Sequence, residues 1–330
     1  MNVINWLLED DQPSMRYLTL TELLGRPNED PEVNSAKESI TKFGWARDIL
    51  AGQTPNGCWA VDEAPRPWLS TDPRPWRSWP KYTSTNWMLL ILSDLGLTKD
   101  EPRIEKACRG WMKRFGMKDG GFNDEPHDKV GHLCITGNTA RAMIKFGYVD
   151  HPRVRRAFEW LVKNQAEGGG WDCFHRRGTL DSWEPLSAFA VYPRERWTRS
   201  MKLAVERGAE FFLKRQLHRQ GSRYEPWYRF HYPIHYYYDL LVGLDFMTAL
   251  GYSNDKRLGY AISLLSEKRR TDGRWNLDAI NPEAESPQGK WNKSHPNEAS
   301  IPFALEEVGK PSKWITLTAE KVLKRVSSAH

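Results

Sequence analysis

A short glycine–aromatic turn that recurs along the chain constrains the fold more than any other feature. The segments "AGQTPNGCW" (51–59) and "KNQAEGGGW" (163–171) each place a glutamine six residues before a tryptophan. "RFGMKDGGF" and "EKRRTDGRW" end on Phe122 and Trp275 in the same way, and a degenerate copy with Gln216 and Gly221 is expected near residue 222. A spacing of about 50 residues is typical of an array of supersecondary units.

Each period contains two helical patterns of different character. The first is apolar, as in "YTSTNWMLLILSDLG" and "IHYYYDLLVGLDFMTALG", and the second is polar and amphipathic, as in "DHPRVRRAFEWLVKNQ". An all-round apolar helix is buried, whereas an amphipathic helix faces solvent on one side. Six inner helices surrounded by about six outer helices predict an all-α (α/α)6 toroid, and we expect one domain over residues 1–330.

Composition excludes several functional classes. The net charge of +6 comes from Lys and Arg that are mixed with acids, so the sequence predicts no nucleic-acid partner. We find no secretory leader and no apolar run that could span a bilayer, which predicts a cytoplasmic protein, with peripheral membrane contact left open. The four cysteines lie far apart without CxxC spacing, which argues against a disulfide framework and a four-cysteine zinc site.

The recurring turn follows a helix with the pattern Arg-Ala-x-x-Phe/Trp-Leu, as in "RRAFEWL". This combination resembles the QW repeat of the squalene cyclase and protein prenyltransferase superfamily, whose fold is an (α/α)6 toroid. "CITGNTARAMIKFGYVDHPRVRRAFEWLVKNQ" and "GKPSKWITLTAEKVLKRV" are similar to small single-domain prokaryotic proteins that are squalene-cyclase-like or prenyltransferase-like. The resemblance implies an isoprenoid-handling enzyme, closest to a class II terpene cyclase, with a central aromatic cavity.

The connections predict which end of the barrel carries function. Inner-to-outer links such as "GYVDHP" are tight, whereas outer-to-inner links are long and gather at one mouth. The same topology points the N-termini of the inner helices toward this mouth, where free N–H groups and helix dipoles favour an anion. We therefore expect a hydrophobic or anionic small-molecule substrate.

Asp239 is the expected catalytic acid, because desolvation of a buried carboxyl favours the neutral form that a general acid needs. Asp181 and Glu184 are the second choices. A helix cap or a hydrogen-bonded structural acid is the alternative interpretation of Asp239. The residues expected to bind substrate are Arg16, Tyr17, Asn86, His132, Asn138, Trp183, His235, Tyr237, Tyr238, Lys310 and Lys313.

The resemblance also implies motifs that this chain lacks. Class II terpene cyclases use a protonated aspartate in a DxDD motif, and aromatic rings stabilise the carbocations. This chain has 16 Trp but no DxDD, so a single isolated acid would have to serve. The class I motif DDxxD is incomplete in "EDDQPS", where Ser14 replaces the last acid.

No metal site is predicted. Protein prenyltransferases hold zinc through an Asp-x-Cys pair and a later His, but the matching helix start has Trp183 in place of the cysteine. A second group of cysteines and histidines is spaced too irregularly to predict a zinc site. It consists of Cys134, Cys173, His175 and either His231 or His235. Cofactors stay unassigned, with Mg²⁺ and Zn²⁺ left open.

Two other functions remain as alternatives. The first is a glycan-active lyase or hydrolase on an α/α toroid, with Trp platforms for sugar rings and His235, Tyr237 and Arg16 for proton abstraction. The candidate platforms are Trp68, Trp76, Trp79, Trp171 and Trp183. The second is a non-catalytic toroid that binds a lipid or a protein. Convergence of the mouth acids on one cavity favours an enzyme over a binding protein.

Overall fold

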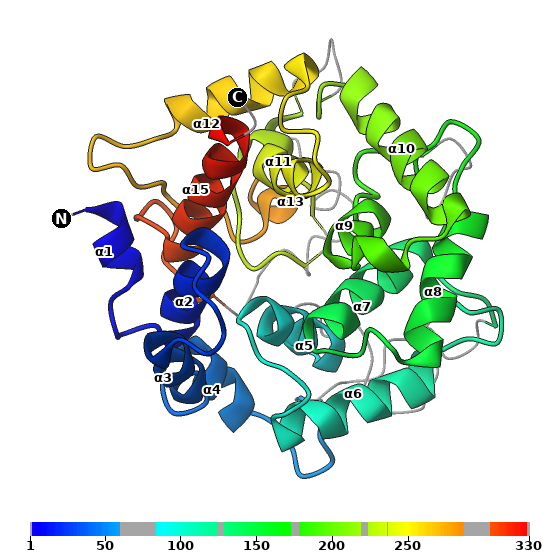
Figure 1. Ribbon diagram of the computed structural model, residues 1–330, viewed down its shortest axis with the longest axis horizontal. Coiled ribbons are helices and arrows are strands. Elements are labelled where there is room, and N and C mark those ends of the chain that lie inside the picture. Colours follow the sequence, from blue (N-terminus) through cyan, green and yellow to red (C-terminus); the bar gives the residue numbers. More distant parts are fainter. Residues whose placement is uncertain are drawn as a thin grey trace.

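The computed structural model describes residues 2–59, 84–123, 129–172, 178–218, 224–235, 237–286 and 304–328. Within them the chain is helical, and its β-type pairing is limited to isolated bridges. The inner helices are α2 (Pro13–Leu18) with its continuation η1 (Thr19–Leu23), α5 (Thr85–Asp94), α7 (Leu133–Lys145), α9 (Glu184–Val191), α11 (Leu240–Ala249) and α15 (Lys313–Ser327). Figure 1 shows them around the centre of the molecule.

The outer helices lie around this inner group (Figure 1). They are α1 (Val3–Leu7), α3 (Pro31–Ser39), α4 (Trp45–Ala51), α6 (Pro102–Phe115), α8 (Pro152–Lys163), α10 (Arg199–Lys214) and α12 (Gly259–Glu267). In the described parts of the connections, four short helices occur: η2 (Arg194–Arg196), η3 (Glu225–Tyr228), η4 (Lys256–Leu258) and α13 (Pro282–Glu285). No described helix is both long enough and apolar enough to cross a bilayer.

The inner helices form a closed ring. Contacts run from α5 through α7, α9 and α11 to α15, and α15 in turn contacts α2 and η1. The ring of Tyr17 in α2 lies against Gly96, directly after α5, so the first inner helix also meets the second. All residues of α5 are buried, whereas α8 buries Val154, Ala157 and Leu161 and exposes the opposite side. The predicted all-α toroid with apolar inner and amphipathic outer helices is confirmed.

The recurring turn forms the corner between an outer and an inner helix. The indole N–H of Trp171 donates to the carbonyl of Leu161, ten residues earlier, at 2.9 Å. Trp59 and Trp275 make the equivalent bonds to Ile49 and Leu265 at 2.6 and 2.7 Å. Each ring therefore caps the C-terminal end of its outer helix, which leaves carbonyls without helical partners.

The glutamine and the glycine of the corner have separate roles. The Gln165 amide donates to the carbonyls of Gly169 and Ala204 at 2.6 and 2.7 Å, which ties the corner to α10. Gly169 has φ +92°, a conformation that favours glycine, and a Cβ there would lie 2.5 Å from the carbonyl oxygen of Arg207. The degenerate copy keeps Gln216, with φ 52°, while Gly221 lies outside the described residues.

Candidate active site

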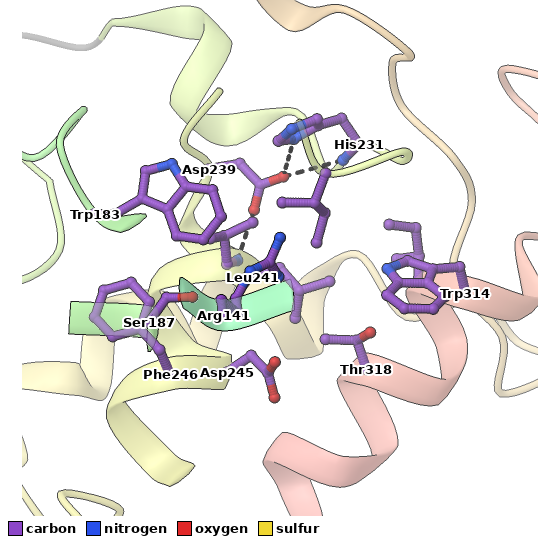
Figure 2. A pocket seen from close by; sticks show the side chains of 13 residues that line it. Arg141, Trp183, Ser187, His231, Asp239, Leu241, Asp245, Phe246, Trp314 and Thr318 are labelled. Atoms are coloured by element: carbon purple, nitrogen blue, oxygen red, sulfur yellow. Dashed lines mark hydrogen bonds and ion pairs between the residues drawn. The ribbon is translucent and has the colours of Figure 1, made fainter. Parts of the chain in front are cut away.

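A cavity lies between α7, α9, α11 and α15, at the end where the long links enter. About 30 Å³ of it is open to a water-sized sphere, and both aromatic and ionisable side chains line it (Figure 2). The lining residues that matter for chemistry are Arg141, Trp183, His231, Asp239, Phe246 and Trp314. Two predicted residues, Asp239 and Trp183, thus meet on one cavity, and Arg141 and Phe246 were not predicted.

Asp239 and His231 form a buried pair in the cavity wall. The Asp239 carboxylate caps α11, with Oδ1 accepting the N–H of Val242 at 2.8 Å. Its Oδ2 accepts the backbone N–H of His231 at 3.0 Å and lies 2.5 Å from His231 Nδ1. Both residues are only 1% exposed. The capping role and a position in the cavity therefore occur together, and the imidazole partner is a residue that sequence reasoning did not pair with Asp239.

The segment before α11, residues 230–235 and 237–239, is here called the mouth segment. Its Tyr232 ring stacks on Trp314 of α15, with centroids 4.2 Å apart, and its His235 ring meets Trp87 of α5 edge-on at 5.2 Å. The His235 carbonyl accepts the Asn138 amide of α7 at 2.8 Å. The mouth segment therefore fills much of the space between three inner helices with its own rings.

Burial controls the protonation of these side chains. It lowers the pKa of His235 well below its ordinary value, and the nearby charge of Arg141 acts in the same direction. Burial also raises the pKa of Tyr232 well above its ordinary value. His235 is therefore neutral and Tyr232 protonated at neutral pH.

Arg141 is a buried cation in the middle of the cavity wall (Figure 2). It is 6% exposed, and its guanidinium lies 5.5 Å from the centroid of the Trp183 ring. Nη1 is 3.5 Å from Asp94 Oδ1, which also accepts from Lys145 Nζ at 2.6 Å. The sequence signal that could have found it is the arginine inside the apolar pattern "CITGNTARAMIKFG".

Asp245 marks the other end of the cavity and belongs to an ion-pair cluster. Burial raises its pKa, but Lys321 and Arg325 outweigh burial and bring the pKa to about 2. Arg325 Nη1 donates to Asp245 Oδ1 at 2.8 Å, and Lys321 also pairs with Glu22. Asp245 is therefore an ionised and neutralised residue, not a proton donor at neutral pH.

Glu306 is a second carboxyl that sequence reasoning missed. Burial raises its pKa to about 7, against the effects of the Ser312 hydroxyl, the backbone N–H groups of α15 and the Lys313 charge. The carboxylate accepts the Lys313 N–H at 2.6 Å and the Ser312 hydroxyl at 2.5 Å. It caps the inner helix that carries Trp314, but it is not among the residues that line the cavity.

Several predicted residues pack near the mouth. Glu184 is fully buried at the start of α9, and Asp181 accepts the indole N–H of Trp227 at 2.8 Å. Tyr238 donates its hydroxyl to the Leu217 carbonyl at 2.8 Å, and Tyr237 lies edge-on to His231 at 6.4 Å. Asn86 Oδ1 lies 3.1 Å from the Ser84 hydroxyl. None of these five lines the cavity described above.

The predicted cationic residues lie elsewhere. Lys313 Nζ contacts Glu9 at 3.0 Å and Asp11 at 2.5 Å. Arg16 donates to the Leu8 carbonyl at 2.6 Å and pairs with Asp10 at 3.1 Å. Lys310 is exposed, and none of the three lines the cavity. Arg16 and Lys313 instead hold the N-terminal residues against the toroid.

The structure also places some of the residues considered as metal ligands or as platforms for sugar rings. His132 Nδ1 contacts Cys134 Sγ at 3.1 Å, whereas Cys173 and His175 lie outside the described residues. No group of three His, Cys, Asp or Glu suited to a metal occurs in the part of the chain that the structure describes. Trp171 is fully buried as a corner residue. The other proposed platforms, Trp68, Trp76 and Trp79, lie outside the described residues.

Comparison with known proteins supports the predicted resemblance. No protein-family model matches the chain. A squalene–hopene cyclase from Bradyrhizobium diazoefficiens is 32% identical over 95 residues, which are 26% of this chain and 14% of that protein. This match confirms the resemblance to squalene cyclases, while the chain covers only a small part of the relative's length.

Two solved structures are similar over most of the chain. One, a protein from Actinoplanes, has a TM-score of 0.48 and 15% identity, and the match covers 97% of this chain and 90% of that one. The other is a variant of the type II terpene cyclase MstE from Scytonema in complex with geranylgeranyl dihydroxybenzoate. It has a TM-score of 0.43 and 17% identity, and the match covers 97% of this chain and 87% of that one.

Proposed function

We propose that the cavity binds an isoprenoid chain and that Asp239, paired with His231, donates the proton that starts its cyclisation. One observation carries this proposal: a buried carboxyl, hydrogen-bonded to an imidazole, forms part of a cavity wall that also contains aromatic rings. An acid in such a place can reach a bound alkene while water is kept away from the cation that forms.

The first step is a proton transfer from Asp239 to a terminal alkene carbon. The alkene π electrons form the new C–H bond, the O–H electrons stay on the carboxylate, and the neighbouring carbon becomes a cation. The backbone N–H groups of His231 and Val242 donate to the two carboxylate oxygens and stabilise the charge that remains there. His231 Nδ1 adds a third contact to the same carboxylate.

The rings in the cavity wall suit the cationic stages. Trp183, directly before α9, lines the cavity together with Phe246 of α11 and Trp314 of α15. The interaction of a cation with the face of an aromatic ring contributes about 0.5–2 kcal/mol, and it is strongest for tryptophan. Each ring can therefore stabilise a carbocation without offering a nucleophile as reactive as water.

A product assay tests this proposal. Purified protein is incubated with squalene, its epoxide, and farnesyl and geranylgeranyl diphosphate, with and without Mg²⁺ or Zn²⁺, and cyclised products are sought by mass spectrometry. Asp239→Asn should fold, because asparagine also caps helices, and should form no product. Asp181→Asn, at the carboxylate that accepts from Trp227, is the matched control and should retain activity. Full turnover by a folded Asp239→Asn protein contradicts the proposal.

A further inference from the structure

We infer that Arg141 binds a carboxylate group of the substrate in the same cavity, so that the substrate is an isoprenoid acid. The isoprenoid part of this inference rests on the proposed function. The carboxylate part rests on the hydrogen-bonding groups and charges around Arg141 and is tested by binding alone.

The donors of Arg141 are only partly used. Nη1 faces Asp94, whereas Nε and Nη2 are buried and have no partner among the described residues. Nε–H and Nη2–H lie side by side on one edge of the guanidinium, which is the edge that binds a carboxylate through two parallel hydrogen bonds. Buried donors of a charged group almost always have partners, because leaving them without one is costly. The arrangement therefore points to a ligand with two acceptor oxygens.

With Asp239 protonated, as the proposed function requires, the remaining acids around Arg141 already have other cationic partners. Lys145 already lies 2.6 Å from the Asp94 oxygen that Arg141 approaches at 3.5 Å. Asp245 is paired with Arg325 and also interacts with Lys321. A buried cation without full compensation is expensive, so an anion in the cavity is the natural counterpart.

A second donor lines the same cavity. The indole Nε1 of Trp314 is buried and has no partner among the described residues. An indole N–H can only donate, so it too calls for an acceptor. The side chains of Ser187 and Thr318 also line the cavity and add hydroxyl groups (Figure 2). Two groups that only donate favour an oxyanion over a cation or an amine.

The size of the charge favours a carboxylate over a diphosphate. Among the described residues that line this cavity, Arg141 is the one Lys or Arg. A diphosphate carries more than one negative charge, which a single buried arginine would leave largely unbalanced. A bound carboxylate would also neutralise Arg141, which would otherwise repel the carbocation of the proposed reaction.

The test is a binding measurement with farnesoic acid and farnesol, which differ at the polar end. Dissociation constants are measured by isothermal titration at neutral pH without following turnover. Wild-type protein should bind the acid at least about 10-fold more tightly than the alcohol, as a charge-assisted pair of hydrogen bonds implies. Arg141→Gln should lose this preference, and Arg141→Lys should retain a smaller one. Arg194→Gln, at an arginine that donates to the Ala249 carbonyl on the outside of the toroid, should behave like wild type.

Other results would overturn the inference. These are equal affinity of wild type for acid and alcohol, no binding of either, or an acid preference that survives in Arg141→Gln. Ligand-free Arg141→Gln should unfold at the same or a higher temperature than wild type, since the change removes an incompletely paired buried cation. A large drop would instead assign Arg141 a structural ion pair with Asp94. An acid preference without any cyclised product would contradict the proposed function and leave the inference standing.

Discussion

The corners of the toroid and the cavity at its mouth use the same kind of side chain in opposite ways. At a corner, Trp171 is fully buried and its indole N–H is bonded to the Leu161 carbonyl. In the cavity, Trp314 is 8% exposed and its indole N–H has no partner among the described residues. The corners therefore complete their bonding within the protein, whereas the cavity retains donors that suit a ligand.

The largest effect is expected at a corner. Trp171→Ala removes a fully buried ring and the bond to Leu161, and should lower the free energy of unfolding by about 3–5 kcal/mol. Urea unfolding followed by circular dichroism measures it. A loss below about 1 kcal/mol would show that the corner ring does not carry this part of the stability.

A pair of glycines separates conformation from close packing. Gly169 and Gly147 have similar φ values of +92° and +89°, but only at Gly169 would a Cβ meet a backbone atom, at 2.5 Å. Gly147→Ala should cost about 1 kcal/mol from conformation alone, and Gly169→Ala about 3 kcal/mol. Equal losses in the free energy of unfolding, measured with urea, would show that close packing at Gly169 does not contribute to stability.

The mouth should respond to pH through Glu306. Its pKa of about 7 in the folded protein lies above the ordinary value of 4.5, so the folded state binds more protons between these values. Stability should therefore fall as pH rises from about 4.5 to about 7, by about 2 kcal/mol after allowance for partial exposure. Glu306→Gln should remove most of this fall. Unfolding curves across this pH range that coincide for both proteins would contradict the assignment.

The smallest effect compares the two indoles directly. Trp171→Phe and Trp314→Phe both replace an indole by the smaller phenyl ring, but only the first removes an indole hydrogen bond. Trp171→Phe should therefore be less stable than Trp314→Phe by about 1 kcal/mol in the absence of ligand. Equal stabilities would mean that the corner and the cavity do not differ in the way described.

The sequence predicted the corners well because the residues that form each turn are close together in the chain. Gln165, Gly169 and Trp171 lie within seven residues of each other, and their spacing fixes the turn. The cavity depends on contacts between distant repeats, which no local spacing reveals. The predicted anion-binding Lys313 is paired with Asp11, 302 residues away, and Arg141 instead occupies the cavity wall. Asp239 was predicted because a carboxyl at the start of an apolar helix is visible locally, but its bond to His231 was not.

The most direct test of the central claim is isotope incorporation. An isoprenoid with a terminal alkene is incubated with the protein in D₂O, and the cyclised product is analysed by mass spectrometry. Proton donation by Asp239 should place one solvent deuterium on the carbon of the former terminal alkene, and Asp239→Asn should give no product. Cyclised product without deuterium at that carbon would contradict a reaction that begins with protonation.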